Sequence, residues 1–333
     1  MNNIDYFEKR FSVGVTLGMT LAENKAIIDE FKDNIYDMYF SPPMGAKYHT
    51  RKQVTSELEL EGSEEYLWEF LNYIKQNDIK LELALNTFRL NEKDIINAID
   101  YTLNHIHIDS IVTQDKYADL IRSKYPNVPL TYSYNNNIRT LQELEDIRSL
   151  LYTDVVLGSS SIRDFEMFRY LKNKGFRTRY LINNGCSFNC LWCSCSQFCL
   201  NIFEMNLRKY SVDELYALQS IFPWELHSHT KNEWSIDIIK ISSRTSTYDI
   251  LRRCLYSYIN NINKEYILEN VRYYYLWGRL GHFSKYHHIF NYEKIDSIKK
   301  RIWQSETKRL DLCYPLMTAN FKDYTNAVQA LSK

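Results

Sequence analysis

Short runs of β-branched and aromatic residues alternate along this chain with longer stretches in which apolar residues recur at helical spacing. Short runs of this kind predict buried strands, and the longer stretches predict amphipathic helices. The predicted strands cover residues 11–17, 35–40, 79–85, 110–113, 130–134, 154–157, 177–182 and 236–241. The predicted helices cover residues 23–32, 63–75, 91–103, 116–124, 140–151, 162–174, 212–222 and 247–258.

Eight successive strand–helix units place the chain in the α/β class. Such alternation is typical of a parallel sheet with crossover helices, and eight units in about 250 residues match the size of a (β/α)8 TIM-type barrel. An open doubly wound sheet is the alternative, although no glycine-rich phosphate loop follows the first predicted strand. We therefore predict a barrel over residues 1–258, with a cysteine-rich cluster segment at 183–206, and a helical extension packed on the barrel over residues 259–333.

The net charge and the N-terminal residues of the chain argue against several classes of protein. Lys plus Arg and Asp plus Glu number 41 each, so the formal net charge is zero, which argues against a strongly electrostatic nucleic-acid binder. The chain begins with polar and acidic residues, unlike a secretory signal, and no apolar stretch is long enough to span a bilayer. We therefore expect a cytoplasmic protein without a membrane partner, in which clustered cysteines bind metal more often than they form disulfides.

The C-terminal ends of the strands carry the active site in barrels of this type. Most predicted strand ends here carry small or amide side chains, such as Asn86 and Gln114, which commonly cap the helices that follow. The end of the eighth strand differs, because Lys240 and Arg244 supply two cations there.

The strongest chemical signal is a run of cysteines directly after the seventh predicted strand. Five of the seven cysteines lie between residues 186 and 199, and thiolates select zinc, copper(I) or iron–sulfur clusters. Cys186, Cys190 and Cys193 are separated by three and two residues, as in four-iron clusters. With Cys199 or Cys195 as the fourth ligand, this spacing predicts a 4Fe-4S cluster at the catalytic face of the barrel.

Other candidate ligands carry weaker signals. A structural zinc site is the alternative for the cysteine run, although zinc sites usually pair two CxxC knuckles across a longer loop. Cys254 lies inside an apolar helical pattern, where a buried free thiol is ordinary. His227 and His229 fall in a loop predicted before the eighth strand, and we assign them no ligand role.

The cysteine run resembles the CxxxCxΦC motif of the radical S-adenosylmethionine superfamily, in which Φ is an aromatic residue. The matching residues are Cys186, Cys190, Trp192 and Cys193. In that superfamily the motif normally follows the first strand, whereas here it follows the seventh predicted strand. The resemblance implies that three cysteines ligate the cluster and that S-adenosylmethionine binds the remaining iron.

A more extended resemblance, over most of residues 11–258, is to the peptidase family U32, whose barrels include cluster-dependent hydroxylases. The segments that resemble the family are residues 128–135, 154–158, 185–186 and 237–244. In the last segment the Lys and Arg of the family signature are retained, and Ser242 and Ser243 replace its usual Glu and Gly.

The U32 resemblance implies an oxygen-independent hydroxylation or a related redox modification of a small molecule or an RNA base. Its cofactor would be a 4Fe-4S cluster on Cys186, Cys190, Cys193 and Cys199, or with Cys195 as the fourth ligand, and prephenate is implicated as the oxygen donor. Peptidase activity is not expected, because the sequence shows no HExxH motif and no nucleophile–base constellation.

Substrate binding is assigned to the ends of the seventh and eighth strands. We expect Lys240 and Arg244 to bind an anionic substrate group, Arg244 through bidentate contacts, and Asn183 to orient a polar substrate atom. The substrate would be an anionic or polar small molecule or an RNA base, and the sequence leaves the need for a partner subunit open. A zinc-binding protein without catalysis is the alternative outside the enzymes.

Overall fold

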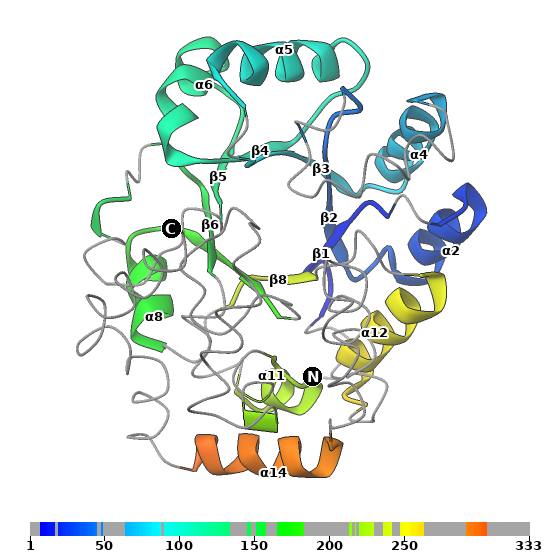
Figure 1. Cartoon of the computed structure of the whole chain (residues 1–333), viewed down its shortest axis with the longest axis vertical. Helices are drawn as coiled ribbons and strands as arrows, with labels where there is room; N and C mark the ends of the chain where they lie inside the picture. Colours follow the sequence, from blue (N-terminus) through cyan, green and yellow to red (C-terminus); the bar gives the residue numbers. More distant parts are fainter. Residues whose placement is uncertain are drawn as a thin grey trace, which may run out of the picture.

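The structure confirms the predicted alternation: eight parallel strands close into a barrel in sequence order, and helices surround it (Figure 1). The strands are β1 (Phe11–Gly14), β2 (Ile35–Phe40), β3 (Lys80–Leu85), β4 (Ser110–Thr113), β5 (Leu130–Tyr132), β6 (Asp154–Leu157), β7 (Arg177–Leu181) and β8 (Ile238–Ile241). The computed structural model describes residues 7–16, 19–44, 48, 64–87, 90–133, 145–147, 151–157, 165–182, 213–214, 217, 220–229, 236–241, 247–262 and 291–304.

Closure of the barrel depends on β1, which pairs with both β2 and β8. In the strand register Ser12 lies opposite Asp37 on one side and opposite Lys240 on the other. Strands β2, β4 and β6 have the boundaries that the sequence predicts, whereas β1, β5 and β7 end one to three residues earlier. The (β/α)8 prediction is therefore confirmed at the level of topology.

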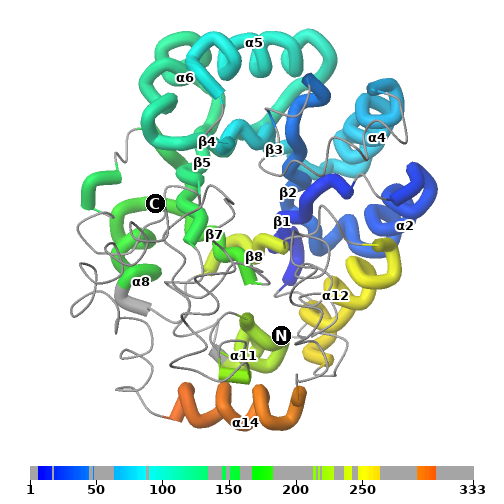
Figure 2. Tube along the Cα trace, viewed as in Figure 1, coloured from blue at the N-terminus to red at the C-terminus, as the bar shows by residue number. Residues whose placement is uncertain are grey.

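The helices follow the strands and cover the outside of the barrel, as the chain trace in Figure 2 also shows. The described helices are α2 (Leu21–Phe31), α4 (Glu64–Gln76), α5 (Glu92–Leu103), the short 3-10 helix η2 (Asp115–Tyr117), α6 (Ala118–Lys124), α8 (Phe165–Asn173), α11 (Pro223–His229), α12 (Tyr248–Asn260) and α14 (Tyr292–Trp303). Helix α2 contacts both α4 and α12, and α14 lies in the predicted extension and packs beside α11. Within the described ranges, no helix is both long and apolar enough to cross a membrane.

Local sequence signals fix where helices begin. Thr20 Oγ1 accepts a hydrogen bond from the backbone of Glu23, and the Glu23 carboxylate accepts one from the backbone of Thr20, so α2 begins with a capping box. Asn91 and Asp94 form the same motif at the start of α5. Because a cap satisfies backbone N–H groups that have no partner within the helix, each one stabilises its helix by about 1 kcal/mol.

An apolar core fills the space between the strands and the helices. Successive strand residues point to opposite faces, so each strand contributes alternate side chains to this core. Examples of these buried side chains are Val13, Met38, Leu83, Ile111 and Val155. Burying one such side chain stabilises the fold by about 1.5–3 kcal/mol, and the core therefore holds the helices on the barrel.

The connection between β7 and β8 differs from the prediction. The sequence predicts a loop at its two histidines, and this prediction is wrong, because helix α11 contains them. Pro223 occupies the first helical position, where its missing N–H costs nothing. The Glu225 carboxylate accepts a hydrogen bond from the backbone N–H of Phe222, as in half of a capping box. These start signals place a helix directly after the predicted range 212–222.

Candidate functional site

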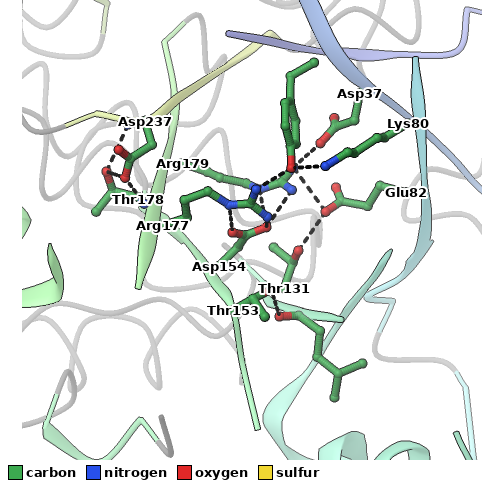
Figure 3. Close-up of polar contacts among 12 residues, drawn as sticks. Asp37, Lys80, Glu82, Thr131, Thr153, Asp154, Arg177, Thr178, Arg179 and Asp237 are labelled. Atoms are coloured by element: carbon green, nitrogen blue, oxygen red, sulfur yellow. Dashed lines mark hydrogen bonds and ion pairs between the residues drawn. The ribbon is translucent and has the colours of Figure 1, made fainter. Parts of the chain in front are cut away.

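The inner face of the barrel carries charged side chains at alternate strand positions. The buried members, which we name the interior ionic cluster, are Asp37 on β2, Glu82 on β3, Asp154 on β6, Arg179 on β7 and Lys240 on β8. Figure 3 shows Asp37, Glu82 and Asp154 gathered around Arg179. Branched apolar residues usually fill the interior of such barrels, so an ionic interior is an unusual property of this chain.

Arg179 is the centre of the interior ionic cluster. Its side chain is 1% exposed and binds three carboxylates: Asp37 Oδ2 at 2.6 Å, Glu82 Oε1 at 3.2 Å and Asp154 Oδ2 at 2.7 Å. Burial alone would lower the pKa of Arg179, but the three carboxylates raise it well above its usual value. One guanidinium from β7 therefore links β2, β3 and β6 across the barrel.

Glu82 has donors on both of its oxygens. Thr131 Oγ1 on β5 donates to Oε1 at 2.8 Å, and Lys240 Nζ on β8 donates to Oε2 at 3.0 Å. Burial acts to raise the pKa of Glu82, but the attraction of Arg179 and Lys240 outweighs it and lowers this pKa to about 2. Glu82 is therefore a carboxylate at any neutral or mildly acidic pH.

Asp37 is less well satisfied than Glu82. Its Oδ2 accepts the hydrogen bond from Arg179, but Asp37 Oδ1 has no hydrogen-bond partner among the described residues. The neighbouring Ser12 Oγ on β1 is likewise buried without a close hydrogen-bond partner in that part of the chain, although its hydroxyl lies near enough to Asp37 to favour the ionised carboxylate. Burial raises the pKa of Asp37 and outweighs the opposing effect of Arg179, while the negative charge of Glu82 adds to the rise. Two carboxyl groups of one cluster thus differ in the direction of their pKa shifts.

Lys240 lies toward the C-terminal end of the barrel, one residue before the end of β8. Its Nζ lies 3.6 Å from the centroid of the Tyr39 ring, besides its ion pair with Glu82. The Tyr39 hydroxyl donates to the backbone oxygen of Ile241 at 2.7 Å, which fixes the ring at the end of β8. The side chain of Lys240 is 11% exposed, so the predicted anion-binding lysine is a mostly buried, paired cation.

Tyr36 lies at the opposite, N-terminal end of the strands. Its hydroxyl accepts hydrogen bonds from Lys80 Nζ at 2.8 Å and from Arg177, whose guanidinium also lies 5.0 Å from the Tyr36 ring. Arg177 in turn forms a bidentate ion pair with Asp154 at 2.5 and 2.9 Å. Arg177, whose side chain is 41% exposed, therefore extends the interior ionic cluster from Asp154 to the N-terminal end of the barrel.

Polar side chains that directly follow β3, β4 and β5 contact one another. Asn86 Nδ2 donates to Ser133 Oγ at 3.1 Å, and Gln114 Nε2 donates to the Asn86 backbone oxygen at 3.3 Å. Ser133 and Gln114 are buried. These contacts tie together the C-terminal ends of β3, β4 and β5, and they place amide and hydroxyl groups at the face that carries active sites in this fold.

Most of the predicted site residues lie outside the described residues: Asn183, Arg244, Cys186, Cys190, Cys193, Cys195 and Cys199. The described residues directly before them come together, because Ile182 N donates to Lys240 O at 3.1 Å and β7 pairs with β8. The last described residues before Asn183 and Arg244, which are Ile182 and Ile241, therefore lie at the ends of neighbouring strands. Within the described ranges, no group of three His, Cys, Asp or Glu side chains is arranged as a metal site. Cys254 is a buried thiol in α12 that forms no disulfide, as predicted.

Sequence reasoning missed most of the interior ionic cluster, although a signal for it exists. The segments IYDMYF, KLELAL and RTRYL each place a charged residue in the middle of a run that forms a buried strand. A charge at such a position is rarely buried without a partner. Once the strands are known to close into a barrel, the charges of Asp37, Glu82 and Arg179 can be predicted to pair with one another.

The known proteins that resemble this chain are distant from it. No protein-family model and no curated protein matches this chain. A solved structure of a U32 peptidase aligns at 10% identity and a TM-score of 0.44, over 70% of this chain and 92% of its own. A 4-hydroxy-2-oxoglutarate/2-dehydro-3-deoxyphosphogluconate aldolase aligns at 11% identity and a TM-score of 0.37, over 82% of this chain and 96% of its own. The aldose reductase from Schistosoma japonicum aligns at 11% identity and a TM-score of 0.37, over 94% of each chain. The first is a U32 peptidase, the family that the sequence segments resemble, and at these scores none of the likenesses carries an argument.

Proposed function

We propose that this chain is an iron–sulfur enzyme of the U32 type, which carries out an oxygen-independent hydroxylation or related redox modification of a small molecule or an RNA base. The observation that carries the proposal is the position of the cysteine run, directly after the seventh strand of a closed eight-stranded barrel. In this fold the segments after the strands line the active-site face. Five thiols within fourteen residues at that position are more than a stable fold requires.

The donor set fits a four-iron cluster. Cys186, Cys190, Cys193 and Cys199, or Cys195 in place of Cys199, would hold it, because thiolates are the ligands that such clusters take. A bound cluster supplies one-electron redox chemistry close to the substrate. The register of β7 and β8 supports a common site, since Leu181 lies opposite Lys240 just before both segments leave the barrel.

The remaining roles belong to side chains at these two strand ends. Arg244 would bind an anionic substrate group through its planar guanidinium, and Asn183 would orient a polar atom of the substrate. Lys240 already neutralises Glu82, so its role would be to donate its remaining N–H groups and not to supply an uncompensated charge. This division makes Arg244 the principal anion-binding residue of the proposal.

Metal analysis tests the proposal directly. Protein purified without oxygen should contain about four iron and four sulfide per chain and absorb visible light. Cys186→Ser, Cys190→Ser and Cys193→Ser should each lose most of the iron, and comparison of Cys195→Ser with Cys199→Ser identifies the fourth ligand. Cys254→Ser is the matched control, because this thiol is buried in α12 and should not affect iron content. A colourless protein with one zinc and no iron would overturn the proposal in favour of a zinc-binding protein.

Ligand binding separates the two enzyme classes. Under the proposal, prephenate binds the iron-loaded protein, and Arg244→Ala weakens this binding at least tenfold, because a charge-assisted hydrogen bond contributes about 1.5–3 kcal/mol. S-adenosylmethionine should not bind. Tight binding of S-adenosylmethionine, with iron content that depends on Cys186, Cys190 and Cys193 alone, would instead identify a radical enzyme.

A further inference from the structure

The pairing of β1 with β2 is irregular, because the strand register skips Tyr36 and brings Ser12 opposite Asp37. Successive residues of a regular strand point to opposite faces, yet Tyr36 and Asp37 both contact arginines of β7. The Tyr36 hydroxyl accepts a hydrogen bond from Arg177, and Asp37 Oδ2 accepts one from Arg179 at 2.6 Å. Irregular pairing of this kind often redirects a side chain next to a functional site. Here it directs the Asp37 carboxyl into the barrel, beside Ser12.

Polar and charged groups from five other strands face Asp37 or the guanidinium that it shares. They are Ser12 on β1, Glu82 on β3, Asp154 on β6, Arg179 on β7 and Lys240 on β8. Lys80, which lies opposite Asp37 on β3, is exposed and donates to the Tyr36 hydroxyl instead. Within the interior ionic cluster three carboxylates therefore face two buried cations. Arg177 adds a positive charge at Asp154, but its side chain is 41% exposed, so the fully buried charges are one cation short.

Asp37 is the carboxylate that can take up the missing positive charge as a proton. Both oxygens of Glu82 and both oxygens of Asp154 contact cations. Asp37 Oδ1 and Ser12 Oγ, in contrast, are buried without a close hydrogen-bond partner among the described residues. A protonated carboxyl donates through one oxygen, and a hydroxyl oxygen accepts, so one proton on Asp37 Oδ1 would satisfy both atoms. Burial and the negative charge of Glu82 raise the pKa of Asp37, in agreement with this assignment.

We propose that Asp37 is a proton-binding site of the barrel: at neutral pH it holds a proton on Oδ1, donates it to Ser12 Oγ and keeps the buried charges of the interior ionic cluster balanced. Figure 3 shows Asp37 within this cluster.

The proton at Asp37 has a consequence for anions at the C-terminal end of the barrel, where Lys240 ends the cluster. Loss of the proton adds one negative charge inside the barrel, close to Lys240, and this charge repels an anion that approaches the lysine. Anion binding should therefore weaken as pH rises and Asp37 ionises. By reciprocity, a bound anion makes Asp37 hold its proton more strongly. This consequence rests on the proposed function, because it takes the C-terminal end of the barrel to bind an anionic substrate group.

The proton itself is tested in the full-length protein without any ligand. Aspartate is labelled with 13C at the side-chain carboxyl, and its NMR resonances are followed from acid to alkaline pH. We expect one labelled carboxyl to be protonated at pH 7 and to ionise only at higher pH, and Asp37→Asn should lack its resonance. Asp237→Asn is the matched control, because Asp237 accepts hydrogen bonds from Thr178 outside the cluster, and this variant should keep the resonance.

A wild-type protein in which every labelled carboxyl is ionised at pH 7 would overturn the proposal. If Asp37→Asn does not fold, Ser12→Ala gives the assignment instead. Loss of the acceptor beside Asp37 should shift the resonance of the protonated carboxyl and leave the other resonances in place. A protonated resonance that Ser12→Ala leaves unchanged would also overturn the proposal.

The consequence for anions is tested with prephenate and the iron-loaded protein. The affinity is measured below and above the pH at which the labelled carboxyl ionises. Wild type should bind prephenate about threefold or more weakly above this pH, whereas Asp37→Asn should bind it equally well at both. An equal loss of affinity in wild type and Asp37→Asn would overturn the link to anions. If prephenate binds at neither pH, the anion site of the proposed function fails and the link fails with it, while the NMR result still decides whether Asp37 holds the proton.

Discussion

Glu82 and Asp37 share the guanidinium of Arg179 and yet differ in how well the barrel satisfies them. Glu82 accepts hydrogen bonds from Thr131 and Lys240 as well, whereas Asp37 Oδ1 has no hydrogen-bond partner among the described residues. Burial acts on both groups in the same direction, so the number of donors and nearby cations decides the outcome. The pKa of Glu82 falls to about 2, and the pKa of Asp37 rises.

Replacement of Glu82 by Gln should therefore be costly. The amide oxygen of Gln can accept from Thr131, Arg179 or Lys240. The amide NH2 group is a donor, so it would face the remaining donors without an acceptor between them. We expect Glu82→Gln to lower the free energy of unfolding by about 3 kcal/mol or more at pH 7, as for other broken buried ion pairs. Urea denaturation measures the change, and a loss below about 1 kcal/mol, the size of an exposed pair, would contradict the ionic role of Glu82.

The same change at Asp37 should depend on pH in the opposite way. Because the pKa of Asp37 is raised by folding, its contribution to stability is present below its unfolded pKa near 3.8 and is lost as pH rises through the folded pKa. Asn does not titrate, and it keeps an acceptor for Arg179. We expect the urea midpoint of Asp37→Asn, relative to that of wild type, to be higher at pH 8 than at pH 4. A relative midpoint that is equal or lower at pH 8 would refute this view of Asp37.

At the scale of elements, the sequence predicts what depends on local pattern. Strands β2, β4 and β6 are each encoded by a short apolar run. The cap of α5 is likewise local, because it depends on Asn91 and Asp94, three residues apart. The pairing of Glu82 with Lys240 joins residues 158 positions apart, and only the closed strand register brings them together. The hydrophobic periodicity did not predict α11. This helix begins at Pro223, a residue that is favoured at the first position of a helix. The cysteine-ligand assignment stays a prediction, since those residues lie outside the described part of the chain.

The cap of α5 offers a test of a local signal. Asn91 Oδ1 accepts a hydrogen bond from Asp94 N at 2.9 Å. Asn91→Ala removes this acceptor and should destabilise the protein by about 1 kcal/mol, measured as a shift of the denaturation midpoint. Asn91→Asp is the control, because it keeps an oxygen acceptor and adds favourable charge at the helix N-terminus. Equal destabilisation by both variants would mean that the side chain has another role.

At the scale of the whole molecule, the interior ionic cluster joins strands that are distant in the sequence. Arg179 on β7 binds carboxylates from β2, β3 and β6, and Lys240 joins β8 to β3. Each contact forms only when the barrel is closed. Opening of any one strand therefore breaks contacts on several others, and the barrel should unfold as one unit.

This linkage predicts where acid unfolds the protein. Folding lowers the pKa of Glu82 from 4.5 to about 2, so the stability that it contributes is complete above pH 4.5 and is lost as pH falls toward 2. We expect the free energy of unfolding to decline steeply within this window, with circular dichroism lost in a single transition. Glu82→Gln should show a shallower decline, and an identical pH profile in wild type and variant would exclude Glu82 as a source of the acid sensitivity.

The hydrogen bond from Ile221 N to Ile182 O has a consequence for the history of this protein. Because the two residues are direct neighbours in space, the chain between residues 182 and 213 can change in length without moving the end of β7 away from Ile221. The entropy of closing a loop changes by only about 0.6 kcal/mol for each doubling of its length. Insertions and deletions in this excursion are therefore nearly neutral for the barrel. Natural selection can alter the number and spacing of the cysteines while the scaffold stays the same, so the two parts of the protein are free to evolve at different rates.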